Sequence, residues 1–134
     1  MAAQRILVIE DEPGAREALE SLLSEEGYTV ASAENGEAGL RRLTEFHPDT
    51  VVCDFYLPDT DGLQILRRVR SQAHPVTFIV ITGACGGDGV ERLLQREADF
   101  FLQKPVDLKR LRHALERHAG PRAHANGHAA PAQT

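Results

Sequence analysis

The sequence predicts an α/β fold in which five parallel β-strands form one sheet with helices on both faces. Short apolar runs rich in β-formers alternate five times with segments of helical periodicity. Strict alternation of this kind favours parallel strands joined by right-handed helical crossovers. Two of the runs, 50–54 and 77–81, lack polar alternation, as expected of strands that are covered on both faces.

Each predicted element has its own local signal. Apolar residues recur at helical spacing from residue 15, and Gly27 is a natural residue to end that helix. Pro48 ends the second helix, and Asp61 and Gly62 fit the turn and cap before the third. In chain order the predicted elements are a strand at 5–9, a helix at 15–26, a strand at 28–33, a helix at 34–47, a strand at 50–54, a helix at 62–71, a strand at 77–81, a helix at 90–97, a strand at 99–102 and a helix at 107–119.

Length and composition limit the class of protein. The chain has 134 residues, which favours one domain, assigned to residues 1–119; residues 120–134 lack apolar periodicity and are predicted to be a disordered tail or linker. A net charge of −5 argues against nucleic-acid binding, and no apolar run is long enough to span a membrane. The N-terminus turns acidic too early for a signal peptide, and two cysteines make no disulfide framework, so we expect a cytoplasmic protein.

Charged and hydroxyl side chains occupy the carboxyl ends of four predicted strands. Glu10 and Asp11 follow the first, Asp54 ends the third, Thr82 follows the fourth, and Lys104 follows the fifth. Ligands of open parallel sheets bind beyond these ends, where the strand order reverses. If the first and third strands are neighbours, the three carboxylates share one crevice, and each like-charged pair at ~4 Å costs about 4 kcal/mol.

Two responses could relieve that repulsion: the pKa values of the acids could rise, or a cation could bind. Oxygen donors without a nearby His or Cys suit a hard divalent ion, and a few carboxylates with open positions suit Mg²⁺. A lysine and a hydroxyl at the same place would complete a site for a phosphoryl group.

Four segments, "ILVIEDEP", "VVCDFYLPDTDGL", "IVITGA" and "DFFLQKPVDL", occur in an order and spacing that resemble the receiver domain of two-component response regulators, the CheY-like family. The resemblance covers residues 5 to about 118. It implies a doubly wound, flavodoxin-like sheet with strand order 2-1-3-4-5.

The resemblance also implies residue roles at the acidic crevice. Asp54 matches the phosphoacceptor and Asp11 the direct metal ligand. Glu10 matches the second acid, where aspartate is commoner in the family. The metal, Mg²⁺, would be held by Glu10, Asp11, Asp54 and the backbone carbonyl of Tyr56.

Further roles come from the end of the domain. Thr82 matches the switch hydroxyl, Phe101 the aromatic switch residue, and Lys104 the phosphate-contacting lysine. Pro105 would follow a cis peptide bond. Glu97 departs from the family, which usually has a glycine at the end of the fourth helix, so we expect a local difference there.

The implied function is a signalling switch rather than an enzyme with an external substrate. A sensor histidine kinase or histidine phosphotransfer protein would phosphorylate Asp54 with Mg²⁺ bound. The face formed by the fourth helix, fifth strand and fifth helix would then control a downstream target or fused output domain, with a phosphorylation-dependent dimer as one route.

Three other functions remain to be weighed. A Mg²⁺-dependent phosphohydrolase with an aspartyl phosphate intermediate, similar to haloacid dehalogenases, would need a second acid two residues after the nucleophile, where this chain has Tyr56. An FMN-binding flavodoxin-like module would need a phosphate-binding first loop, but "EDEPG" is acidic. A pseudo-receiver would keep the fold as a constitutive binding module, although the complete residue set argues against it.

Overall fold

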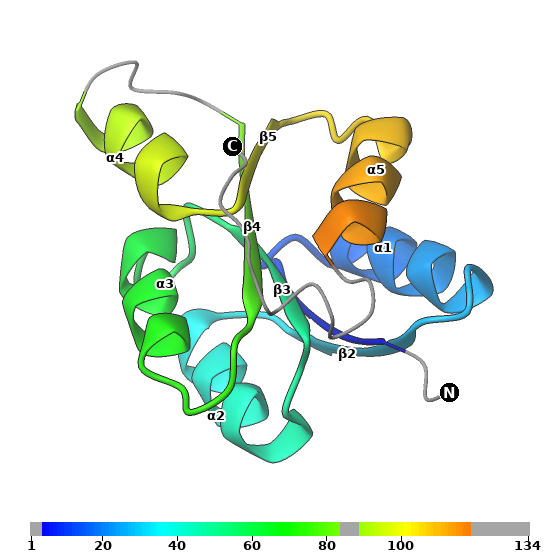
Figure 1. The fold of residues 1–134 in the computed structure, drawn as a ribbon. Helices are drawn as coiled ribbons and strands as arrows, with labels where there is room; N and C mark the ends of the chain where they lie inside the picture. The colour runs from blue at the N-terminus through cyan, green and yellow to red at the C-terminus, as the bar shows by residue number, and fades with distance from the viewer. Residues whose placement is uncertain (1–3, 84–88, 119–134) are drawn as a thin grey trace.

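A computed structural model describes residues 4–83 and 89–118, and within them five strands form one parallel sheet in the order β2-β1-β3-β4-β5 (Figure 1). The predicted fold class and strand order are therefore confirmed. The predicted tail at 120–134 lies outside the described residues, as do residues 84–88. The elements are β1 (Arg5–Ile9), α1 (Pro13–Glu25), β2 (Thr29–Ala33), α2 (Gly36–Phe46), β3 (Thr50–Asp54), α3 (Gly62–Arg70), β4 (Thr77–Thr82), α4 (Gly89–Glu97), β5 (Phe100–Gln103) and α5 (Leu108–His118).

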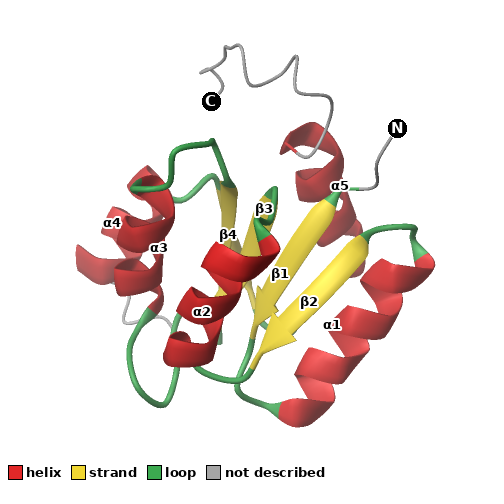
Figure 2. Cartoon of the chain, turned by 90° about the horizontal axis from the view of Figure 1, so that it is seen from below, coloured by secondary structure: helices red, strands yellow, loops and turns green. Residues whose placement is uncertain are grey.

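The sheet separates two hydrophobic clusters because successive side chains of a strand point to opposite faces. Helices α2, α3 and α4 cover one face, where Leu43, Leu66 and Leu94 join the inward side chains of the strands. Helices α1 and α5 cover the other face, with Leu23 and Leu111 in the second cluster. Figures 1 and 2 show this three-layer arrangement, in which every strand of the sheet centre is buried.

Local capping sets where the helices begin. The Glu12 side chain accepts a hydrogen bond from the Ala15 amide, and Pro13 occupies the first turn, so α1 starts two residues before the predicted position. Asp61 caps α3 as predicted, by accepting from the amide of Gln64 at 3.0 Å. The predicted role of Gly27 is also confirmed, because it follows the C-cap residue Glu26 with a φ of 101°.

The end of α2 was only partly predicted. Pro48 follows the helix as expected, but the residue that ends it is His47, with φ 53° in the left-handed region. Among the described residues, His47 and Gly27 alone have positive φ. Glu97 therefore ends α4 without the left-handed conformation that a glycine would favour, which is the local difference expected there.

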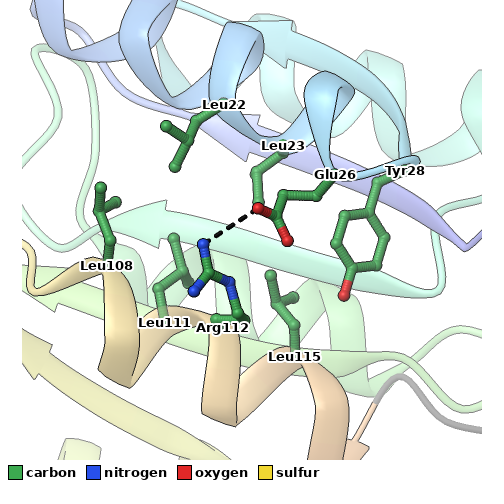
Figure 3. A pocket seen from close by; sticks show the side chains of 8 residues that line it. All are labelled: Leu22, Leu23, Glu26, Tyr28, Leu108, Leu111, Arg112 and Leu115. Carbon is green, nitrogen blue, oxygen red and sulfur yellow. Dashed lines mark hydrogen bonds and ion pairs between the residues drawn. The ribbon is translucent and has the colours of Figure 1, made fainter.

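Helices α1 and α5 lie side by side and line a small pocket that is mostly leucine (Figure 3). Glu26 at the end of α1 and Arg112 of α5 form an ion pair of 3.0 Å across its rim. The two side chains are 46% and 35% exposed, so solvent screens the pair and it contributes little to stability. None of the helices in the described ranges has the length and apolar character needed to cross a membrane.

Candidate acidic site at the carboxyl edge of the sheet

The strand register brings the sequence-predicted site residues to one edge of the sheet. Ile9 of β1 pairs with Cys53 of β3, so the residues that follow them, Glu10 and Asp54, emerge next to each other. Asp54 pairs in turn with Ile81 of β4. Since β1 connects to β2 on one side and has β3 on the other, this edge is the place where the strand order reverses.

Three carboxylates meet at this edge. One oxygen from each of Glu10, Asp11 and Asp54 lies within 4.8 Å of the others. Glu10 and Asp54 are only 3% and 5% exposed, whereas Asp11 faces solvent. Two of the three acids are therefore removed from water, where their mutual repulsion is least screened.

Lys104 supplies the positive charge at the site. Its Nζ lies 2.8 Å from Asp54 Oδ2 and 3.3 Å from Glu10 Oε1. Partial burial alone would lower the pKa of Lys104, but the hydrogen bonds and charges of Asp54 and Glu10 outweigh it, so the pKa is raised and the amine stays protonated. Three carboxylates and one ammonium leave a net charge of −2 when all are ionised.

Glu10 carries much of the cost of this arrangement. Burial raises its pKa above the ordinary value, and the neighbouring charge of Asp54 raises it further. The Glu12 amide, which donates to Glu10 Oε2 at 3.1 Å, and Lys104 offset part of the shift. The raised pKa therefore reflects burial of the Glu10 carboxylate first and the negative charge of Asp54 second.

Asp54 is held at both oxygens. Oδ2 bonds Lys104, and Oδ1 accepts a hydrogen bond of 3.3 Å from the backbone amide of Tyr56. The Tyr56 ring itself is 54% exposed and packs edge-on against Phe55. Tyr56, expected to contribute its backbone carbonyl, thus lies directly against the expected phosphoacceptor, with its side chain turned to solvent.

Thr82 and Phe101 lie on the same face of the sheet. Phe101 pairs with Val80, two residues before Thr82, and side chains two apart on a strand share a face. Thr82 is 3% exposed, and Phe101 is half-buried against the cluster under α2, α3 and α4. The Lys104 amide also donates to the Thr82 carbonyl at 2.9 Å, so the two predicted residues are joined through the backbone.

Sequence reasoning missed Arg16. Its guanidinium donates to the backbone carbonyl of Glu10 at 2.9 Å and to that of Asp11 at 3.4 Å, and so holds the peptide that carries two of the acids. The arginine follows the acidic pair by five residues in the first turns of α1, but nothing in that spacing indicates a bond back to the backbone. The Lys104–Pro105 peptide is cis, as the resemblance implied.

The donor set fits a hard divalent cation. All of the clustered side-chain donors are carboxylate oxygens, and no histidine or cysteine belongs to the cluster found among the described residues. Cys53, although adjacent to Asp54 in sequence, is fully buried, and burial raises the pKa of its thiol well above the ordinary value. The site therefore suits oxygen-ligand chemistry and not thiolate chemistry.

Comparisons with known proteins agree with this geometry. A profile of the response regulator receiver domain matches residues 6–116. The probable C4-dicarboxylate response regulator DctR of Bacillus subtilis is 36% identical over 116 residues, which is 85% of this chain and 51% of that protein. The chain thus spans about half the length of the curated relatives it matches.

Solved structures give the same result. A response regulator receiver domain protein from Clostridium thermocellum is 31% identical with a TM-score of 0.76, over 84% of this chain and 90% of that one. The response regulator TrrA of Thermotoga maritima, solved in complex with Mg²⁺-BeF, is 31% identical with a TM-score of 0.75, over 84% of this chain and 96% of that one.

The haloacid dehalogenase-like and FMN-binding alternatives have no support from these matches, which cover almost all of the described chain. A receiver is a signalling domain of two-component systems, and its phosphorylation site is acidic, as the cluster around Asp54 is. The sheet order, the acidic edge and the matches lead to one conclusion: this chain belongs to the response regulator receiver domain family.

Proposed function

We propose that the chain accepts a phosphoryl group on Asp54 from a phosphohistidine. A carboxylate oxygen of Asp54 would attack phosphorus while the bond from phosphorus to the histidine nitrogen breaks, so that the imidazole leaves and an acyl phosphate forms. The observation that carries the proposal is the meeting of Asp54 with Glu10, Asp11 and Lys104 in one cluster at the sheet edge.

The excess negative charge supports a role for Mg²⁺. Glu10, Asp11, Asp54 and the Tyr56 backbone carbonyl would hold the ion, which would offset the negative charge of the incoming phosphoryl oxygens. Arg16 would keep the Glu10–Asp11 peptide in place from its far side. Lys104, already 2.8 Å from Asp54, is positioned to pair with a phosphoryl group on that residue.

Thr82 and Phe101 would convert phosphorylation into a change of surface. The hydroxyl of Thr82 would turn to the new phosphoryl oxygens, and Phe101 would move inward behind it. The shared face of the two side chains and the incomplete burial of Phe101 support this coupling. The surface of α4, β5 and α5 would then differ between the two states, which is a two-state element biased by a local charge change.

The proposed partners are a protein that donates the phosphoryl group and a target that responds to phosphorylation. A cytoplasmic sensor histidine kinase or histidine phosphotransfer protein would present the phosphohistidine. Since the relatives are about twice the length of the matched region, the output would be a fused domain or a separate protein target, with dimer formation as one way to engage it.

Intact-mass measurement with a small phosphodonor tests the proposal. With acetyl phosphate and MgCl₂, the wild type should gain the mass of one phosphoryl group, and the gain should disappear with EDTA or in Asp54→Ala. Glu12→Gln is the matched control: it lies in the same acidic loop but outside the three-carboxylate cluster, and it should be labelled like the wild type. Equal labelling of Asp54→Ala would overturn the assignment, and an unlabelled, folded wild type would favour the pseudo-receiver.

A further inference from the structure

The loop after Asp54 carries another carboxylate, whose hydrogen bonds play no part in the proposed chemistry of the acidic site. Asp59, in the loop between β3 and α3, accepts hydrogen bonds from the backbone amides of Gly36 at 2.8 Å and Glu37 at 2.9 Å. Both amides belong to the first turn of α2, 22 and 23 residues earlier in the chain. These bonds lower the pKa of Asp59, so the carboxylate is ionised and both oxygens are engaged.

Asp59 is more than a cap for α2. The helix already has its own N-cap, since Asn35 accepts from the Ala38 amide at 2.8 Å. The loop also fits closely on the helix: a Cβ added to Gly36 would lie 2.3 Å from Thr60 Cγ2 and 3.1 Å from Asp59 Oδ1. The absence of a side chain at position 36 thus permits the tip of the loop to dock there.

The same loop begins at the acidic site. Tyr56 forms an isolated β-bridge with Asp61, and the Leu57 amide donates to the Thr60 carbonyl at 3.2 Å. The segment from Tyr56 to Asp61 is therefore closed on itself, so that fixing its tip also fixes its start. Its start is Tyr56, whose amide bonds Asp54 Oδ1.

We propose that Asp59 is a positioning residue that anchors the loop after Asp54 to the N-terminus of α2 and thereby holds the Tyr56 backbone at the acidic site. Its consequence for metal binding rests on the proposed function. Residues that orient a ligand from outside the coordination sphere typically affect metal affinity by ~10-fold or more, and Asp59→Ala should weaken Mg²⁺ binding by about that factor. Asp59→Asn, which keeps one acceptor oxygen, should fall between Asp59→Ala and the wild type.

The test combines amide hydrogen exchange, measured by NMR without metal, with a MgCl₂ titration that follows the Tyr56 amide shift. In Asp59→Ala, exchange should become faster at Gly36 and Glu37, whose amides lose their acceptor. It should also become faster at Tyr56 and Leu57, whose amides donate to Asp54 Oδ1 and to the Thr60 carbonyl. Glu37→Gln removes a neighbouring exposed charge without removing an acceptor, and should leave exchange and Mg²⁺ affinity near wild type.

The outcomes separate the two proposals. Faster exchange confined to Gly36 and Glu37 would mean that Asp59 only caps α2, and the inference would be wrong. If Glu37→Gln lost as much Mg²⁺ affinity as Asp59→Ala, the loss would be explained by net charge alone, and the inference would again be wrong. If the wild type binds no Mg²⁺, the proposed function fails, yet the exchange at Tyr56 and Leu57 still decides the role of Asp59. Should Asp59→Ala not fold, Asp59→Asn decides on the same amides.

Discussion

Replacing Lys104 by methionine should destabilise the metal-free protein through charge and not through packing. Within the described residues, Lys104 forms the ion pairs of the acidic site, with Asp54 and Glu10. Methionine retains most of the aliphatic stem and removes the ammonium group. The variant would leave three clustered carboxylates without their cation.

The magnitude follows from the distances. At an effective dielectric constant near 20, Lys104 attracts Asp54 at 2.8 Å by about 6 kcal/mol and Glu10 at 3.3 Å by about 5 kcal/mol. The carboxylate oxygens lie within 4.8 Å of one another, so each pair repels by at least about 3.5 kcal/mol at the same dielectric constant. Desolvation of the charges offsets most of this attraction. Because the Lys104 side chain is 33% exposed, removing its ammonium group should cost more than breaking a surface ion pair and less than breaking a buried one, at about 2 kcal/mol. For a domain of this size that is a fall in Tm of about 8 °C.

Thermal unfolding in EDTA measures the effect. Lys109→Met, at an exposed lysine of α5, is the matched control and should change stability by less than about 0.5 kcal/mol. In an Asp54→Asn background, the penalty of Lys104→Met should shrink, because one partner and one repulsive charge are gone. An undiminished penalty in that background would assign the effect to the stem of the side chain and refute the electrostatic reasoning.

Three other predictions concern stability. Folding raises the pKa of Glu10 above its ordinary value of 4.5, so the protein is most stable when Glu10 is protonated and loses that stability as pH rises through the folded-state pKa. Glu10→Gln should abolish this loss of stability in unfolding curves measured at several pH values in EDTA. Gly36→Ala should cost about 1–3 kcal/mol because of its clash with Thr60, whereas Gly14→Ala, with no contact under 3.4 Å, should be neutral or stabilising by up to ~1 kcal/mol in the same denaturant titration. Arg112→Gln, which removes the exposed ion pair of Figure 3, should cost less than about 1 kcal/mol and should not change phosphorylation.

The sequence was sufficient to predict the elements and the edge where the acids meet. Apolar runs without alternation indicated covered strands, and a parallel sheet places every strand end at one edge. Glu10 and Asp54 meet there only if the first and third strands are neighbours, which the alternation of elements does not decide. The resemblance supplied the strand order and the cis bond before Pro105, which periodicity alone does not contain.

Contacts between side chains and distant backbone were not predictable in the same way. Arg16 donates to backbone carbonyls and Asp59 accepts from backbone amides, and nearly every residue of a chain offers both groups. The partner is therefore chosen by how loops and helices approach in three dimensions, and no residue type at the other end marks it. Gly36 is the exception, since a glycine at the start of a helix can indicate that another segment lies against it.

The electrostatic state of the site links its stability to its function. A buried Glu10 with a raised pKa and a net charge of −2 mean that the folded protein without a bound cation keeps costs of burial and repulsion that unfolding would relieve. In the proposed function, a divalent ion would neutralise that charge, while a phosphoryl group on Asp54 would add to it again and would give Lys104 and Thr82 a new anionic partner. The same residues that make the metal-free site unfavourable would therefore make the domain responsive to both Mg²⁺ and phosphorylation. Relieving the repulsion by mutation, as in Asp54→Asn, should stabilise the metal-free fold while removing both responses.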